Sequence, residues 1–319
     1  SLRRQRQMCI RDSFGREIME VFSVGVGNYA ESDVYAAARV FTGWNMCINA
    51  GGSADEPNSY FEFIFNPDDH ETSSKTLTFP VYPDGSRTLK PRSAGDGMQE
   101  GLDLIAALAR HPETARRLAR QLWTFFVSEL EAPPEDFVSE VAQVYLRSDT
   151  EMRPVLDYIL RSPWFADPRS QYARYAWPVE FVARAIKETG WEGFSLDSAR
   201  AALPEMGQML FEPPDVNGWE LGPGWISTGT MLARMNFAAT LAANQKVNLA
   251  QAVPEATRSS GDALVTYMLE RFSPMGYSDA ARAALVAYAG GTGTGSSDVA
   301  ARVAGLARLL MGSAEYQFV

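Results

Sequence analysis

The chain has 319 residues, of which 46% are hydrophobic and 21% are charged, as is typical of a globular protein with a sizeable core. Its 39 acidic and 29 basic residues give a formal net charge of −10, which argues against a nucleic-acid partner and against an anionic lipid surface. No apolar run approaches the roughly 18 residues of a membrane-spanning helix, so we expect no transmembrane segment.

Residues 1–13, SLRRQRQMCIRDS, differ in character from the rest of the chain. They form no helical apolar stripe and lack the apolar segment of a secretory signal. The string resembles translated sequencing-adapter read-through from metagenomic data, so we interpret it as an artefactual, disordered leader. We therefore expect the chain to be truncated upstream, with any signal region missing. Without Cys9, the chain retains Cys47 alone, which cannot close an internal disulfide.

Helical periodicity begins at Phe14 and continues until Gly25, where a glycine is expected to end the helix. A second helix is predicted over 33–42. Ser32 is its expected N-cap, and Asp33 lies in the first turn, where the helix dipole favours an acid.

The segment 45–97 is rich in Gly, Pro, Asn, Asp and Ser, and it contains two β-like runs. These runs, 60–65 and 75–79, are rich in aromatic or β-branched residues and partly alternate with polar ones. About ten residues separate them, too many for a tight hairpin. The pattern predicts a small antiparallel ribbon inserted at about 58–82, with a polar loop.

From Met98 onward the pattern is helical, with breaks at His111-Pro112 and Pro133-Pro134. Beyond these breaks, helices are predicted at about 135–147, 151–161, 178–189, 197–209, 229–243, 260–272, 278–289 and 298–311. The expected fold is mainly α: one multi-helical globular domain over 14–319 that carries the β-ribbon insertion.

A candidate metal site lies in Asp68-Asp69-His70-Glu71, because carboxylates and imidazole suit divalent cations. Alternate residues of an extended segment point in opposite directions, so at most two of these side chains could share one ion. Asp69, His70 and Glu71 are therefore candidate ligands of a divalent metal, and a solvated loop is the alternative interpretation. Arg16, Glu17 and Lys75 are the residues that would assist His70 in catalysis.

Other catalytic patterns find little support in the sequence. Arg16 and Glu20 form an expected surface pair at i,i+4 spacing. A Ser–His–acid triad is disfavoured, because the chain has only two histidines and no G-x-S-x-G motif. The glycine-rich segment 290–295 lacks the preceding strand and the following lysine of a phosphate-binding loop, so we interpret it as a linker.

Tryptophans in turn-rich segments are candidate binding residues, because a flat aromatic face matches a sugar ring or an apolar peptide. Trp44, Trp219 and Trp225 are of this kind, and Asn217 lies in the same loop as Trp219. The alternative interpretation is that loop tryptophans fold over helix ends as part of the core.

Taken together, these motifs resemble the bacterial "domain of unknown function 1800" family. The resemblance spans 14–319 and matches the C-terminal part of the family. The matching motifs are GREIMEVFSVGVGNY at 15–29, Glu31, Asp33-Val34, Ala37-Ala38-Arg39, Thr42-Gly43-Trp44, His70, Lys75, His111-Pro112, Thr114-Ala115, Leu122-Trp123, Phe125-Phe126, PPDVNGW at 213–219, Trp225, Arg234, Asn236-Phe237 and Glu315-Tyr316-Gln317.

The resemblance implies no established activity. It implies an exported protein, periplasmic or extracellular, whose gene often neighbours that of a sulfatase-like exported protein. It also implies a longer N-terminus, with a further helical region and an Asn-rich run. Glu71 departs from the family, which usually has aspartate after the histidine; the extra methylene weakens the metal interpretation.

Two functions therefore remain open at the level of sequence, and whether the protein is an enzyme is uncertain. The first is a non-catalytic, envelope-associated protein that binds another protein, with the sulfatase-like protein as the expected partner, or a glycan. The second is a metal-assisted hydrolase whose site lies near Asp69, His70 and Glu71.

Overall fold

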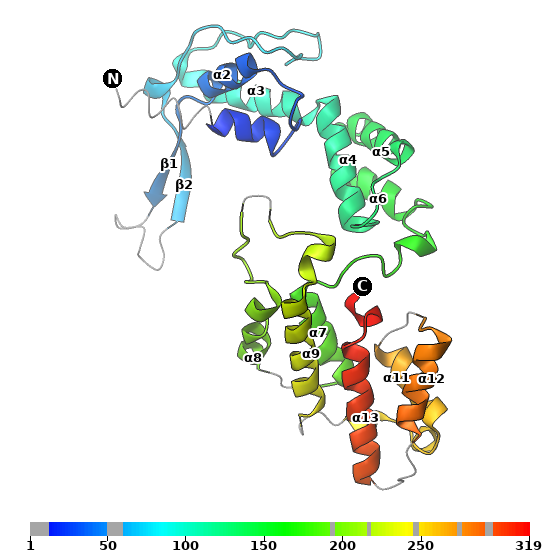
Figure 1. Cartoon of the computed structure of the whole chain (residues 1–319). Helices are drawn as coiled ribbons and strands as arrows, with labels where there is room; N and C mark the ends of the chain where they lie inside the picture. Colours follow the sequence, from blue (N-terminus) through cyan, green and yellow to red (C-terminus); the bar gives the residue numbers. More distant parts are fainter. Residues whose placement is uncertain are drawn as a thin grey trace. The chain divides into compact units, whose positions relative to one another are not determined.

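The computed structural model describes residues 13–49, 60–191, 195–215, 218–244, 249–272, 276–290 and 296–319. Over these ranges the protein is mainly α-helical, with one two-stranded antiparallel sheet (Figure 1). This confirms the predicted fold class. The proposed leader falls, except for Ser13, outside the described residues. None of the helices in the described ranges is both long and apolar enough to cross a membrane.

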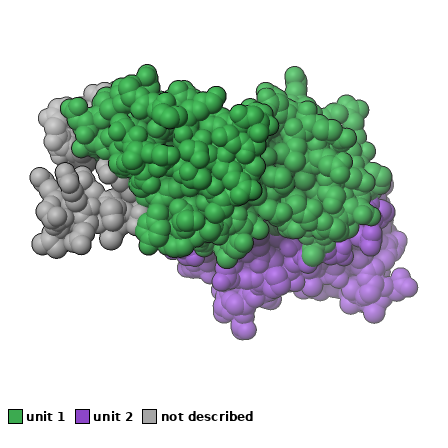
Figure 2. Space-filling view, turned by 90° about the horizontal axis from the view of Figure 1, so that it is seen from above, with its two compact units in different colours: residues 1–127, 132–166 green, residues 128–131, 167–319 purple. Residues whose placement is uncertain are grey.

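The chain divides into two compact units, coloured separately in Figure 2. Unit 1 comprises 1–127 and 132–166, and unit 2 comprises 128–131 and 167–319. Among the described residues, unit 1 has two hydrophobic core clusters and unit 2 has one. The single domain over 14–319 stays a prediction.

Unit 1 opens with helical residues 13–20, followed by α2 (Glu31–Val40). The N-cap of α2 is Ala30 and not Ser32, because the Asp33 carboxylate accepts the Ala30 backbone N–H at 2.9 Å. Asp33 is fully buried and also accepts the backbone N–H of Thr78 at 2.7 Å. It therefore ties the start of α2 to the loop that follows the ribbon.

The ribbon consists of β1 (Trp44–Asn49) and β2 (Tyr60–Phe65), in a register that runs from Trp44↔Phe65 to Asn49↔Tyr60. The strand predicted at 60–65 is confirmed, but its predicted pairing with 75–79 is wrong. Lys75, Leu77 and Phe79 are buried while the residues between them are exposed, so this extended segment covers the core of unit 1. It makes only an isolated bridge, between Thr76 and Thr88.

The remaining helices of unit 1 are α3 (Met98–Ala109), α4 (Pro112–Phe126), α5 (Glu135–Arg147) and α6 (Met152–Leu160). His111 separates α3 from α4 and accepts the backbone N–H of Glu113 through Nδ1 at 3.2 Å, which makes it the N-cap of α4. Burial lowers the pKa of His111, in keeping with a neutral imidazole that accepts a hydrogen bond.

Unit 2 is built from helices in the part of the chain from 167 onward. They are α7 (Pro178–Thr189), α8 (Leu196–Ala201), α9 (Thr228–Ala242), α10 (Leu249–Ala252), α11 (Gly261–Phe272), α12 (Asp279–Ala289) and α13 (Ser296–Met311). The helix predicted at 197–209 ends early. Pro204 begins a separate 3-10 turn, η4 (Pro204–Met206), and Gly207 then adopts a φ of +94°.

Candidate functional site

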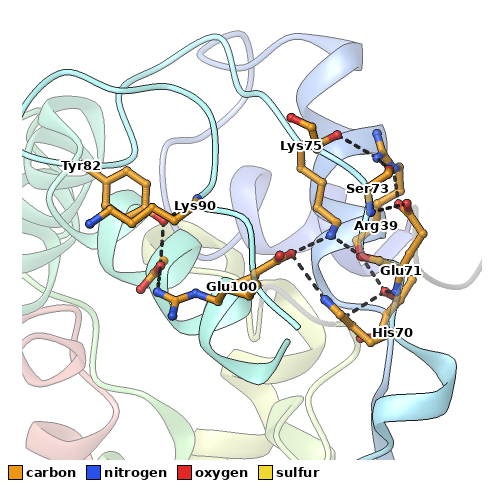
Figure 3. Close-up of polar contacts among 12 residues, drawn as sticks. Arg39, His70, Glu71, Ser73, Lys75, Tyr82, Lys90 and Glu100 are labelled. Carbon is orange, nitrogen blue, oxygen red and sulfur yellow. Dashed lines mark hydrogen bonds and ion pairs between the residues drawn. The ribbon is translucent and has the colours of Figure 1, made fainter. Parts of the chain in front are cut away.

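A buried polar cluster lies where the N-terminus of α3 meets the segment between η1 (Pro67–Asp69) and Phe79 (Figure 3). Lys75 Nζ donates to Glu100 Oε2 at 2.6 Å and to the backbone carbonyl of Glu71. His70 Nε2 lies 3.5 Å from the same Glu100 oxygen. The exposed fractions of the His70, Lys75 and Glu100 side chains are 0%, 1% and 3%. One carboxylate therefore faces two basic side chains away from solvent.

A backbone carbonyl fixes the tautomer of His70. Its Nδ1 lies 2.9 Å from the carbonyl oxygen of Thr42, so Nδ1 carries a proton and donates it. His70 Nε2 then faces the Glu100 carboxylate and has no hydrogen-bond partner within the described residues. Thr42 Oγ1 also accepts the backbone N–H of Glu71 at 2.8 Å, which holds the segment after His70 against the end of α2.

Two glycines of α3 make room for aromatic rings. A Cβ atom at Gly97 would overlap the imidazole of His70, and one at Gly101 would overlap the indole of Trp44. Because Gly97, Glu100 and Gly101 share one turn of the helix, the same turn supplies the carboxylate and the space for both rings.

Asp103 anchors the next turn of α3. It accepts the hydroxyl of Tyr82 at 2.7 Å, a guanidinium N–H of Arg92 at 2.9 Å and the amide of Gln99 at 2.9 Å. Burial opposes ionisation, but these hydrogen bonds outweigh it and lower the pKa of Asp103. The loop that follows Lys75 is thereby tied to the helix that carries Glu100.

Glu71 points away from His70 and Glu100. Its carboxylate accepts Arg39 Nε at 2.5 Å and the backbone N–H of Ser73 at 2.9 Å (Figure 3). Burial alone would raise the pKa of Glu71, but the hydrogen bonds from Arg39 and Ser73 lower it to about 2. Glu71 is therefore an ionised carboxylate already occupied by an arginine.

The three predicted metal ligands are not brought together. Asp69 accepts the amide of Asn66 at 2.8 Å, while Glu71 faces Arg39 and His70 faces Glu100. Throughout the described ranges, no group of three or more His, Cys, Asp or Glu residues is arranged to hold a metal ion. The donor atoms present in this segment thus fit a structural ion-pair network better than a metal centre.

Arg16 and Glu17 also have separate environments. Arg16 forms two hydrogen bonds with Glu31, at 2.7 and 2.9 Å, and Glu20 accepts the hydroxyl of Tyr29. The predicted Arg16–Glu20 pair is therefore wrong. Arg16 pairs with Glu31 and Glu20 pairs with Tyr29, and both partners follow the first helix in the sequence. Glu17 lines an apolar groove of about 450 Å³ in unit 1, whose walls include Phe14, Ile18, Phe22, Ile105 and Leu118.

A second hollow, of about 350 Å³, lies in unit 2 and contains two of the predicted binding tryptophans. Its lining includes Met206, Met209, Glu212, Trp219, Glu220 and Trp225. None of the described residues that line it is Lys, Arg or His. The hollow is therefore lined by aromatic rings, thioethers and carboxylates.

Trp177 supports both tryptophans of the hollow. Its ring centroid lies 5.5 Å from that of Trp225 and 6.2 Å from that of Trp219. Its indole N–H lies 3.4 Å from Glu129 Oε1. Trp225 is only 4% exposed, and its Nε1 is buried with no hydrogen-bond partner within the described part of the chain. Trp219 is the more accessible of the two, so it is the better placed to meet a ligand.

The other two predicted binding residues do not join this hollow. Trp44 belongs to unit 1, where its indole packs edge-on against Phe41 at 5.1 Å and Phe63 at 5.0 Å and covers Gly101. It is a packing residue, as the alternative interpretation of the loop tryptophans states. Asn217 lies outside the described residues.

Sequence reasoning missed Glu100 and the role of Arg234. Arg234 is fully buried in unit 2, where it donates to the carbonyl of Ala176 at 2.8 Å and to Gln317 Oε1 at 3.1 Å. Its guanidinium lies 5.1 Å from the centroid of the Phe181 ring, and burial lowers the pKa of Arg234 to about 10. An arginine at a helical position among apolar residues was the available signal, and the structure shows that it ties α9 to the C-terminal segment.

Several residues of the motifs have defined structural roles: His111 is the N-cap of α4, Lys75 forms a buried ion pair and Trp44 covers Gly101. A family model described as "Protein of unknown function (DUF1800)" matches residues 12–318. The chain belongs to the DUF1800 family. No curated protein matches this DUF1800 chain, and no solved structure does. The site geometry in unit 1 and unit 2 therefore carries the functional argument.

Proposed function

We propose that this DUF1800 chain is a non-catalytic, exported and envelope-associated binding protein, and that the hollow of unit 2 binds a glycan. The observation that carries this proposal is the lining of the hollow. It places an accessible tryptophan, Trp219, beside the carboxylates of Glu212 and Glu220. An indole face packs against the apolar face of a sugar ring, and carboxylates accept hydrogen bonds from its hydroxyl groups.

The closed polar cluster of unit 1 supports a binding role over a catalytic one. A general base or nucleophile must come within hydrogen-bond reach of a substrate. The His70, Lys75 and Glu100 side chains are each at most 3% exposed, and Glu100 already contacts the other two. The metal-assisted hydrolase gains no support, since Asp69, His70 and Glu71 have separate partners.

The first experiment replaces Trp219 with alanine and screens both proteins on a glycan array, followed by calorimetric titration of any ligand found. We expect the Trp219→Ala variant to bind about tenfold more weakly, because an anchoring aromatic side chain contributes more than about 1.4 kcal/mol to binding. Phe211→Ala is the matched control, because Phe211 is 93% exposed and does not line the hollow. Equal binding by wild type and Trp219→Ala would contradict a ligand site in the hollow.

A protein partner is the second ligand that we propose, with the sulfatase-like exported protein implied by the family as its identity. The supporting observation is the groove of unit 1, whose wall residue Phe22 is 74% exposed. Exposed apolar surface of this kind is typical of protein interaction sites. We expect Phe22→Ser to abolish co-purification with that protein and Phe125→Ser to preserve it, since Phe125 is 76% exposed but lies outside the groove. Retention of the partner by Phe22→Ser would contradict this.

A further inference from the structure

We propose that the ligand of the unit 2 hollow is an amino sugar, whose protonated amino group lies between the tryptophan faces and the carboxylates of Glu212 and Glu220. This inference rests on the proposed glycan-binding function and narrows the class of glycan. It is carried by the charge of the lining, by an unpartnered indole donor and by the placement of Glu220.

The charged side chains that line the hollow, among the described residues, are all negative. Glu212 and Glu220 line it, and its described lining contains no basic side chain. Outside the lining, Glu129 accepts the indole N–H of Trp177, and its Oε2 is buried without a hydrogen-bond partner in the described ranges. An acidic sugar would therefore meet like charges, whereas a cationic group would meet opposite ones.

Arg174, a cation that interacts with Glu129, is committed to another carboxylate. Arg174 interacts electrostatically with Glu129, but it forms two hydrogen bonds with Glu180, at 2.7 and 2.8 Å. It is not among the residues that line the hollow. The negative charge of the lining is thus left for a ligand to balance.

The aromatic rings favour a cation as well. An ammonium group over the face of tryptophan is attracted by the quadrupole of the ring, and tryptophan is the most favourable of the aromatic residues for this contact. Trp219 and Trp225 line the hollow, and Trp177 packs against both. The thioethers of Met206 and Met209 add polarizable surface that suits the carbon framework of a sugar.

The indole N–H of Trp225 distinguishes an amino sugar from a simple quaternary amine. This buried donor lacks a partner in the described part of the chain, and leaving it unsatisfied costs free energy. A quaternary ammonium ion has no acceptor for it. An amino sugar offers both an ammonium group for the carboxylates and hydroxyl oxygens for the indole.

Gly224 gives the carboxylate of Glu220 its place in the hollow. A Cβ atom at Gly224 would overlap both the Oε2 and the Cβ of Glu220. The glycine therefore provides the space that the Glu220 side chain occupies at the wall of the hollow.

The test is calorimetric titration of the full chain with three tetrasaccharides: a glucosamine oligomer, its N-acetylated form and a glucose oligomer. Acetylation removes the positive charge and keeps the ring. We expect the glucosamine oligomer to bind at least about fivefold more tightly than the other two. We expect Glu212→Gln and Glu220→Gln to remove that preference, with Glu255→Gln as control, because Glu255 is exposed in unit 2 but does not line the hollow.

The outcomes separate the two proposals. Tighter binding of the glucosamine oligomer that is lost in both glutamine variants, with unchanged circular dichroism, supports the amino sugar. Equal or tighter binding of the acetylated or glucose oligomer overturns the amino-sugar inference and leaves glycan binding standing. Absence of binding to all three oligomers and to every glycan of the array overturns both.

Discussion

Lys75 is a buried ammonium group whose charge is balanced by one residue, Glu100, 25 positions along the chain. Breaking a buried ion pair leaves an uncompensated charge, which costs more than the pair contributes when intact. We expect Lys75→Met to lower the free energy of unfolding by about 3–5 kcal/mol in urea denaturation.

Two further variants control this prediction. Lys187→Met removes an exposed lysine of α7 and should change stability by less than about 0.5 kcal/mol. Lys75→Met combined with Glu100→Met removes both charges and should recover much of the loss. A Lys75→Met variant as stable as the wild type would contradict the argument that the buried Glu100 carboxylate depends on Lys75 for its charge balance.

At the scale of an element, α3 depends on close approach of an aromatic ring to its first turn. We expect Gly97→Ala to lower the free energy of unfolding by about 1–3 kcal/mol, because the added methyl group must displace the His70 ring from its place beside Glu100. Gly95→Ala, two residues earlier, is the control, because its Cβ would have only Ser93 Oγ within 4 Å, at 3.9 Å. Equal stability of the two variants in guanidinium denaturation would contradict the packing argument.

The helices were the most predictable elements, and the polar cluster was the least. Periodic apolar residues and a starting proline predict a helix over 178–189, and α7 has these bounds. The partner of β2 could not be chosen from local sequence, since the burial of Lys75, Leu77 and Phe79 depends on a core assembled from distant segments. Glu100 resembled any solvent-facing glutamate of a first helical turn until the fold placed Lys75 and His70 beside it.

For the tryptophans too, local sequence does not determine which side chains are buried. Trp219 and Trp225 were both expected in exposed loops, yet Trp225 is 4% exposed and Trp44 covers a helix. A loop tryptophan has the same local sequence whether its side chain faces solvent or packs on a neighbouring helix, because its burial depends on which distant segments pack against it. The sequence therefore pointed to two residues of the hollow, Trp219 and Trp225, without identifying which of the two rings is accessible.

At the scale of the whole molecule, each of the two units has its own core clusters. We expect the destabilisation caused by Lys75→Met to be confined to unit 1. Native-state hydrogen exchange followed by mass spectrometry should show faster exchange in α3 and unchanged exchange in α9 and α13. Faster exchange throughout both units would instead support the single cooperative domain that the sequence predicts.

The β1–β2 ribbon has a consequence for handling the protein in solution. Its two strands pair only with each other among the described residues, and Phe61 and Phe63 of β2 are 65% and 45% exposed. Open strand edges with apolar side chains favour edge-to-edge pairing between molecules at high concentration. Concentrated solutions should therefore aggregate through this ribbon first. Replacing Phe61 with lysine should slow that aggregation, because Phe61 belongs to neither unit's core.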